Sequence, residues 1–249
     1  MNENTLERIV TGFIMLVIAI LLALVDSFLV TWFVLGLVYL IAFREACKLF
    51  QTENTMIYVL ALGVWIAAGL SASPEYLGVL VVLGLVAMMA HQKQMDETLL
   101  KPFLYPTISM LFLLSLYVSA GMPALIWLVL IVALTDTGAF IVGKNFGKTP
   151  FSPTSPNKTW EGVAGGIAVA TLAGAFFGMA SVGFLSALLI AFLTSVASVW
   201  GDLYESYLKR EAEVKDSGTI FPGHGGMLDR LDGYLFGGVV LFVLLKSFV

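Results

Sequence analysis

Long apolar runs, separated by short polar segments, dominate the pattern along this chain. A helix needs roughly 20 apolar residues to cross a bilayer, with about 17 to 25 as the usual range. Four runs in the first part of the chain approach this length, and they end at charged residues or at the turn Ser73-Pro74-Glu75. We expect four membrane-spanning helices here, at residues 9–25, 27–43, 56–71 and 76–90.

Two later runs, 103–135 and 162–201, carry no charge and are too long for single spans. We expect the first to break at Gly121-Met122-Pro123, because proline cannot continue a helix and glycine favours its end. We expect the second to break within 179–183, and a last helix to begin near Gly233. The pattern therefore predicts an all-α, polytopic membrane protein with about nine transmembrane helices.

The basic residues predict the orientation of these helices. With nine spans and a cytoplasmic N-terminus, all but Lys246 of the 13 basic residues fall on the cytoplasmic side, as the positive-inside rule requires. Those on the cytoplasmic side are Arg8, Arg44, Lys48, Lys93, Lys101, Lys144, Lys148, Lys158, Lys209, Arg210, Lys215 and Arg230. We expect a multi-pass protein of the cell (inner) membrane whose polar loops 143–161 and 208–230 face the cytoplasm. We assign residues 1–101 to an N-terminal group of four spans and 102–249 to a second membrane region, which contains both polar loops.

Composition supports this class. The chain is 59% hydrophobic and 12% charged, with a mean hydropathy of +0.95, whereas about a quarter of the residues in a soluble domain are charged. The excess apolar residues must face lipid. The single cysteine, Cys47, excludes an internal disulfide, and the N-terminal run indicates an uncleaved helix rather than a removed signal peptide. We expect no nucleic-acid partner.

Mixed charges gather between Asp202 and Asp232. If the preceding helix continues, Asp202, Glu205, Ser206 and Lys209 share one face. A carboxylate at membrane depth is costly and usually functional, and two acids with a hydroxyl suit a hard cation such as Mg²⁺. The alternative is a helix end whose charges reach the interface, and we favour it for Lys209 and Arg210 taken alone.

A glycine-rich loop follows Lys215 and Asp216. Its glycines permit close approach of the backbone to phosphate oxygens, although such a loop can also be a simple connector. Within it, His224 is a proton carrier, a phosphate ligand or a structural residue. Beyond the loop, Asp229 and Arg230 open the last helix, where the helix dipole favours an acid. The functional alternative is that Asp229 meets Asp202 across a shared metal.

A second polar block lies upstream, around Asp136 and Lys158. Asp136 follows a long uncharged run, and it either faces the interior of the bundle or marks a helix end. Lys158-Thr159 superficially matches the end of a P-loop, but the required G-x-x-x-x-G-K spacing is absent, which excludes a Walker A site.

Residues 206–232 read SYLKREAEVKDSGTIFPGHGGMLDRLD, and this segment resembles the signature of the phosphatidate cytidylyltransferase (CDP-diacylglycerol synthase) family. Three upstream segments are also similar to that family: DTGAF at 136–140, GKNFGK at 143–148 and SPNKTWEG at 155–162. The resemblance is strong over about residues 135–232 and loose before them.

The resemblance implies that CTP and phosphatidate react to give CDP-diacylglycerol and pyrophosphate. It implies a homodimer and a Mg²⁺-containing site with room for a second cation, in which Asp202 and Asp229 are the metal ligands. Because two polyanions must meet, catalysis then depends on positioning and charge neutralisation. Asp202, Asp229, Lys209 and Lys215 form the expected catalytic set. The expected substrate-binding residues are Asp136, Lys158, Arg210, Asp216, His224, Gly225, Gly226 and Arg230.

Two other classes remain open from the residues. A secondary transporter also places charges inside a helical bundle, but matching halves with broken helices are not evident. Another CTP-dependent lipid phosphotransferase or kinase is the second alternative. Reaction products separate these enzymes, since cytidylyl transfer releases pyrophosphate, a kinase releases CDP and an alcohol phosphotransferase releases CMP.

Overall fold

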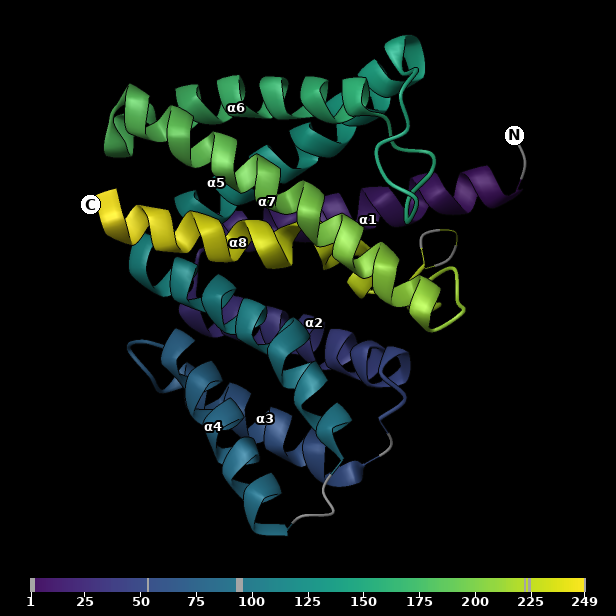
Figure 1. Ribbon diagram of the computed structural model, residues 1–249. Helices are drawn as coiled ribbons and strands as arrows, with labels where there is room; N and C mark the ends of the chain where they lie inside the picture. The colour runs from purple at the N-terminus through teal and green to yellow at the C-terminus, as the bar shows by residue number, and fades with distance from the viewer. Residues whose placement is uncertain (1–2, 53, 93–95, 222, 224, 249) are drawn as a thin grey trace. The chain divides into compact units, whose positions relative to one another are not determined.

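The computed structural model describes residues 3–52, 54–92, 96–221, 223 and 225–248. These residues form helices and connecting loops without a strand; isolated bridges pair Pro150 with Thr159 and Phe221 with Gly225. In chain order the helices are α1 (Glu3–Val25), α2 (Phe28–Leu49), α3 (Thr55–Gly69), α4 (Glu75–Gln92), η1 (Glu97–Leu100), η2 (Phe103–Thr107), α5 (Ile108–Phe146), α6 (Trp160–Val182), α7 (Phe184–Glu211) and α8 (Leu228–Phe248) (Figure 1). The predicted all-α class is confirmed for this part of the chain.

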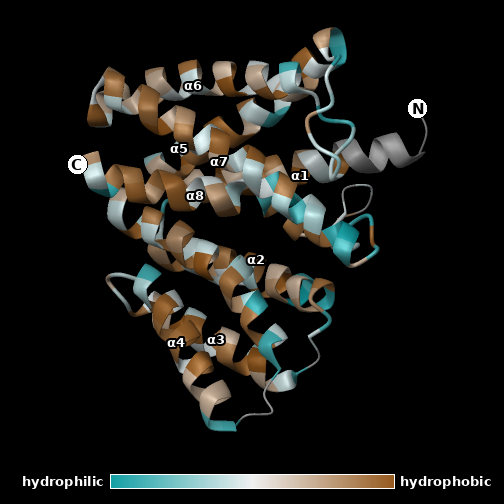
Figure 2. Cartoon of the chain, in the orientation of Figure 1, coloured by the Kyte–Doolittle hydropathy of each residue, from teal (hydrophilic) through white to brown (hydrophobic). Residues whose placement is uncertain are grey.

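Apolar helices of membrane-spanning length support the predicted polytopic membrane protein. Among the described residues, six helical segments are long and apolar enough to cross a membrane: α2, α4, 97–146, α6, α7 and α8. The segment 10–25 and α3 are apolar but shorter. Apolar residues cover most of these helices, and polar residues concentrate toward helix ends and loops (Figure 2). The number of nine spans stays a prediction.

Both predicted breaks in the long apolar runs are present. Gly121 leaves the helical conformation inside α5, with φ 71° and ψ −173°, and Pro123 follows it. Gly183 has φ 77° and separates α6 from α7. Residues with a side chain rarely adopt a positive φ, so glycine is suited to both breaks.

Several helix ends differ from the prediction. Helix α2 continues past residue 43 to Leu49, and α7 runs past 201 to Glu211, which is the continuation that places Asp202 and Glu205 on one face. Charged residues therefore extend these helices, because a helix ends where its backbone bonding ends rather than where its apolar run stops. One helix is shorter than predicted at its start. It was expected from residue 103 and begins at Ile108, after the π-helical turn η2, which contains Pro106.

The chain packs as two units, one of residues 1–122 and 212–230 and the other of residues 123–211 and 231–249. In the first unit, Tyr39 of α2 stacks on Trp65 of α3 with ring centroids 5.1 Å apart, and its hydroxyl lies 2.9 Å from Thr107 Oγ1. In the second unit, α6 and α7 form a hairpin in which Gly174 and Ala191 approach closely. The predicted division of the chain into residues 1–101 and 102–249 was based on the order of the expected membrane spans, and it stays a prediction.

Candidate active site

In the second unit, the loop between α5 and α6 is fixed by side chains at the start of α6. Thr159 caps this helix, since its Oγ1 accepts a hydrogen bond of 3.2 Å from the Gly162 amide. The Glu161 carboxylate accepts hydrogen bonds from the Lys148 and Thr149 amides, each at 3.2 Å, and from the Thr149 hydroxyl at 2.8 Å. This bonding ties the two ends of the loop together immediately beside Lys158.

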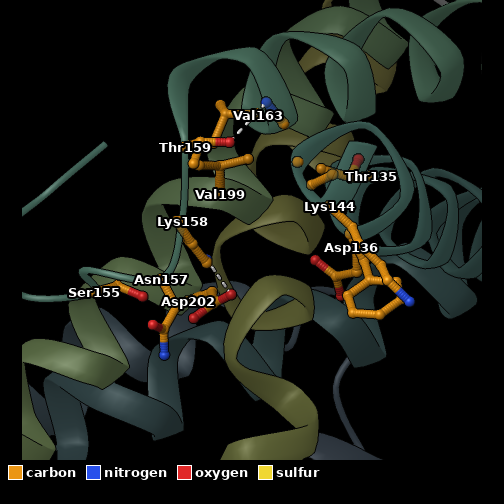
Figure 3. A pocket seen from close by; sticks show the side chains of 14 residues that line it. Thr135, Asp136, Lys144, Ser155, Asn157, Lys158, Thr159, Val163, Val199 and Asp202 are labelled. Atoms are coloured by element: carbon orange, nitrogen blue, oxygen red, sulfur yellow. Dashed lines mark hydrogen bonds and ion pairs between the residues drawn. The ribbon is translucent and has the colours of Figure 1, made fainter. Parts of the chain in front are cut away.

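Lys158 forms an ion pair with Asp202 of α7 (Figure 3). Both side chains are about a quarter exposed, at 26% and 24%. Helix α7 passes through Asp202 without interruption, and the Ser206 hydroxyl lies 3.5 Å from Asp202 Oδ1, one turn later. The structure thus joins the two polar blocks that the sequence separates by 44 positions.

A cavity of about 490 Å³ lies beside this ion pair (Figure 3). Its polar lining comes from α5, the 147–159 loop and α7, and comprises Thr135, Asp136, Lys144, Ser155, Asn157, Lys158, Thr159 and Asp202. Helix α5 continues to Phe146, so Asp136 is not at a helix end. The volume is in the range of small-molecule sites, about 300–1,000 Å³.

Lys209 and Arg210, in the last turn of α7, differ in their surroundings. Lys209 forms an ion pair with Glu205, whose side chain is completely buried. Arg210 is exposed. The helix-end alternative therefore describes Arg210 well, whereas Lys209 compensates a buried carboxylate. Their predicted contacts with phosphate stay predictions.

Asp232 of α8 is a site residue that the sequence-based assignment left out. Its carboxyl group is within electrostatic range of the acids Asp202 and Asp136, which repel its charged form, and of Lys158, which attracts it. Its neighbourhood depends on Gly201, because a Cβ there would collide with the Asp232 carbonyl oxygen. Glycine thus lets α7 approach α8 next to Asp202. The signal was available, since Asp232 lies within the segment that resembles the family.

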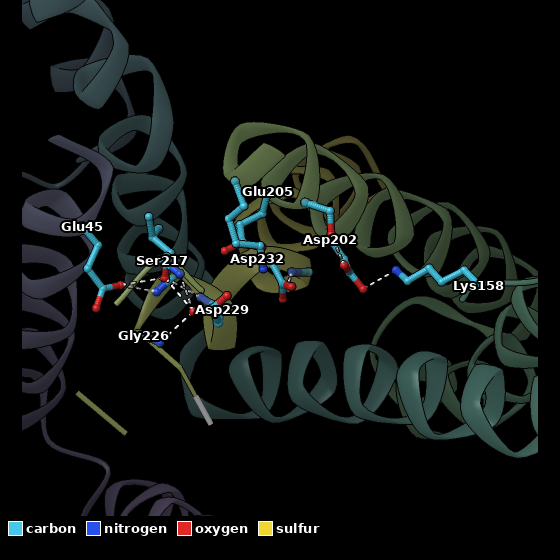
Figure 4. A network of polar contacts seen from close by, with 12 residues as sticks. Glu45, Lys158, Asp202, Glu205, Ser217, Gly226, Asp229 and Asp232 are labelled. Carbon is cyan, nitrogen blue, oxygen red and sulfur yellow. Dashed lines mark hydrogen bonds and ion pairs between the residues drawn. The ribbon is translucent and has the colours of Figure 1, made fainter. Parts of the chain in front are cut away.

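In the first unit, Asp229 organises the glycine-rich loop (Figure 4). Its Oδ2 accepts hydrogen bonds from the Ser217 amide at 2.9 Å, the Ser217 hydroxyl at 2.8 Å and the Gly226 amide at 2.7 Å. One carboxylate oxygen therefore joins residues near both ends of the loop. From the sequence, Asp229 was expected either to interact with the helix dipole or to bind a metal. Its hydrogen bonds to the loop were not predicted.

The remaining loop residues predicted for the site are mostly at the surface. Lys215, Asp216 and Arg230 are exposed. The Phe221 amide donates to the Gly225 carbonyl at 3.0 Å, and Gly225 has φ 80°, so a tight turn closes here. His224 lies outside the described residues.

The donor chemistry fits a hard divalent cation. Asp136, Asp202 and Asp232 offer carboxylate oxygens, and Mg²⁺ in enzymes is usually bound by one or two carboxylates, with water and substrate phosphates completing its shell. Within the part of the chain that the structure describes, no three Asp, Glu, His or Cys side chains form a ligand set by themselves. A cation that arrives with nucleotide phosphates needs no such set. Shared ligation by Asp202 and Asp229 stays a prediction.

Apolar helices around a charged cavity of ligand size are features of a membrane-embedded enzyme or transporter, and comparison with known proteins separates these classes. The model of the cytidylyltransferase family matches residues 6–248. The chain is 43% identical to the phosphatidate cytidylyltransferase of Helicobacter pylori strain 26695 over 242 residues, which cover 96% of this chain and 91% of that protein. It is 44% identical to the phosphatidate cytidylyltransferase of Bacillus subtilis strain 168 over 132 residues, 51% of this chain and 49% of that protein. The chain belongs to the cytidylyltransferase family and is a nucleotidyltransferase.

Proposed function

We propose that this enzyme transfers the cytidylyl group of CTP to phosphatidate, giving CDP-diacylglycerol and pyrophosphate. The observation that carries this proposal is 43% identity to a phosphatidate cytidylyltransferase over nearly the whole chain. The cavity adds independent support, because Lys158 and Lys144 supply cations beside Ser155, Asn157 and Thr159, which supply polar groups. Cations bind phosphate oxygens, and polar side chains can form hydrogen bonds with phosphate or with a nucleoside.

The reaction needs little proton transfer. A phosphate monoester has its second pKa near 6, so phosphatidate is largely ionised at pH 7 without a strong general base. One of its oxygens attacks the α-phosphorus of CTP, and the bond from that phosphorus to the bridging oxygen of the β-phosphate breaks. Pyrophosphate leaves with the electron pair. The obstacle is repulsion between two polyanions, which positioned cations reduce.

The residues of this chain supply that neutralisation. Lys158 is held at the cavity wall by Asp202, where its ammonium group can contact a phosphate oxygen. Arg210, Lys215 and Arg230 add positive charge within 208–230, and Lys209 of the same segment is already paired with Glu205. Asp202 and Asp229 would hold Mg²⁺, and a second cation is compatible with the family resemblance. When bound, Mg²⁺ neutralises phosphate charge and orients the leaving group.

The membrane arrangement follows from charge. We propose nine spans, with α5 crossing twice around Gly121, and a cytoplasmic N-terminus, because all basic residues except Lys246 then lie on one side. Both polar loops then face the cytoplasm, where CTP is available. The lipid tails of phosphatidate stay in the bilayer of the cell membrane. A homodimer is proposed from the family resemblance.

Product analysis tests the reaction. The purified protein is incubated with CTP, Mg²⁺ and phosphatidate, and pyrophosphate, CDP and CMP are quantified. Pyrophosphate with a cytidylylated lipid is the expected result. Release of CDP would identify a lipid kinase, and CMP that forms only when a CDP-alcohol and a second alcohol are supplied would identify an alcohol phosphotransferase.

A further inference from the structure

Glu45 of α2 is a buried carboxylate that reaches the glycine-rich loop within the first unit (Figure 4). Its carboxylate accepts hydrogen bonds from backbone amides at the start of α8, and the residue is only 6% exposed. Oε1 accepts a hydrogen bond from the Met227 amide at 3.0 Å, and Oε2 accepts one from the Leu228 amide at 2.8 Å. Both carboxylate oxygens are therefore used on backbone donors.

The location of Glu45 favours a role toward another helix. It lies near the C-terminal end of α2, where the helix dipole disfavours a negative charge. The N-terminus of α8, by contrast, presents amide groups without partners inside that helix, and a carboxylate satisfies them. Glu45 therefore acts as a cap supplied from a distant part of the chain.

The loop backbone is shaped to admit this carboxylate. A Cβ at Gly226 would lie 2.6 Å from both Glu45 oxygens, and a Cβ at Gly218 would lie 2.7 Å from the carboxyl carbon. Neither distance is sterically acceptable. These two glycines thus leave room for Glu45, which is a reason for their presence other than backbone flexibility.

Ser217 links Glu45 to Asp229. Its hydroxyl lies 3.1 Å from Glu45 Oε2 and 2.8 Å from Asp229 Oδ2. A hydroxyl has one proton, so the two carboxylates share it. Asp229 also accepts from the Gly226 amide, directly beside the Met227 amide bound by Glu45. A shift of Glu45 would therefore disturb two of the groups that orient the Asp229 carboxylate.

We propose that Glu45 is a positioning residue for the transferase reaction: it clamps the start of α8 and the glycine-rich loop, and thereby fixes the orientation of Asp229. The inference rests on the proposed function, in which Asp229 takes part in the site. Glu45 itself touches no reacting atom in this account; it acts through Ser217, Gly226 and the α8 N-terminus.

The test compares Glu45→Gln with Glu75→Gln in the full-length, purified protein. Glutamine keeps the shape of glutamate but offers one acceptor oxygen, so one of the two amide bonds is lost. Glu75 is a matched control, because it is 8% exposed, lies at the start of α4 and accepts a hydrogen bond of 2.6 Å from the Ser115 hydroxyl. Hydrogen exchange across 212–230, melting temperature, kcat and KM for CTP are measured for each variant.

For Glu45→Gln we expect exchange at 217 and 226–228 to accelerate by about tenfold or more, the effect of losing one hydrogen bond to a charged acceptor. We expect kcat to fall by about tenfold, because Asp229 is held less firmly, while KM for CTP changes less than threefold. Glu75→Gln should lower the melting temperature but should change neither hydrogen exchange at 217 and 226–228 nor kcat. If Glu45→Gln does not fold, Glu45→Asp carries the same test with smaller shifts in the same direction.

Unchanged exchange or unchanged kcat in Glu45→Gln would overturn the inference. Equal losses of kcat in the two variants would also overturn it, since they would reflect general destabilisation. Failure of the proposed function is distinct from these results: wild-type protein would then produce no pyrophosphate, while the exchange measurement would still show whether Glu45 clamps the loop.

Discussion

Replacing Lys158 by methionine removes the ammonium group that pairs with Asp202 and leaves a side chain of similar length. The change affects the charge inside the cavity and leaves the hydrogen bonds of the 147–159 loop in place, because Lys158 takes part in them through its backbone and not through its side chain. Asp202 then loses the cation that pairs with it, and Asp232 loses a cation that acts on it electrostatically. The variant therefore separates the electrostatic role of Lys158 from its position in the fold.

Stability and activity should respond very differently. The Lys158–Asp202 pair is about a quarter exposed, between exposed ion pairs, which contribute about 0.2–1 kcal/mol, and buried pairs, in which loss of one partner costs about 3–5 kcal/mol. For a chain of this size, each 1 kcal/mol corresponds to a melting shift of roughly 2–4 °C. By contrast, loss of one group that neutralises transition-state charge costs about 100- to 1,000-fold in kcat, or about 3–4 kcal/mol.

The assay measures pyrophosphate release as a function of CTP and phosphatidate, together with thermal unfolding in detergent. Lys246→Met is the matched control, because Lys246 lies in the last turn of α8, over the Phe242 ring, and we expect it to retain wild-type kcat. Lys158→Arg, which keeps the charge, should lose less activity than Lys158→Met. A Lys158→Met enzyme with kcat within twofold of wild type would refute the assigned role.

Three further outcomes are expected. Asp202→Asn and Asp229→Asn should each lower Mg²⁺-dependent transfer by at least about 100-fold while the protein still inserts, and wild-type turnover by either would contradict the metal assignment. Gly201→Ala should destabilise the protein by about 1–3 kcal/mol in thermal unfolding, because its Cβ collides with the α8 backbone. Gly84→Ala, where nothing lies within 4 Å, is its control, and equal melting temperatures would contradict the packing argument. Lys215→Ala should raise KM for CTP by about threefold to tenfold with little change in kcat, because an exposed charge contributes modestly to binding. Unchanged kinetics would show that Lys215 is an ordinary solvated loop residue without a role in CTP binding.

Local backbone chemistry made several features predictable from the sequence. Gly121 and Gly183 break the apolar runs because each adopts a positive φ that other residues avoid. The all-α class followed from apolar run lengths. The family resemblance placed Lys158 and Asp202 in one site, but it assigned Asp202 a metal shared with Asp229, and the ion pair of Asp202 with Lys158 was not predicted.

Long-range contacts could not be predicted in the same way. The contact of Glu45 with Ser217 spans 172 positions, and no local pattern distinguishes Glu45 from an ordinary charge at a helix end. The anchoring of the loop by Asp229 depends on how the loop folds back, which periodicity does not specify. The end of α2 was also misplaced, because charged residues extend this helix beyond its apolar segment. The continuation of α7 past Asp202 was left open by the sequence, and the helix does continue.

Cytidylyl transfer breaks the bond between the α-phosphorus of CTP and the bridging oxygen of the β-phosphate, and the fate of the α-phosphorus tests this most directly. Purified enzyme receives CTP labelled at the α-phosphorus, with phosphatidate and Mg²⁺, and label in the lipid is compared with pyrophosphate released. Cytidylyl transfer predicts labelled lipid and pyrophosphate in equal amounts. Unlabelled lipid product with labelled CDP in solution would contradict it, because the γ-phosphoryl group would then have been transferred instead.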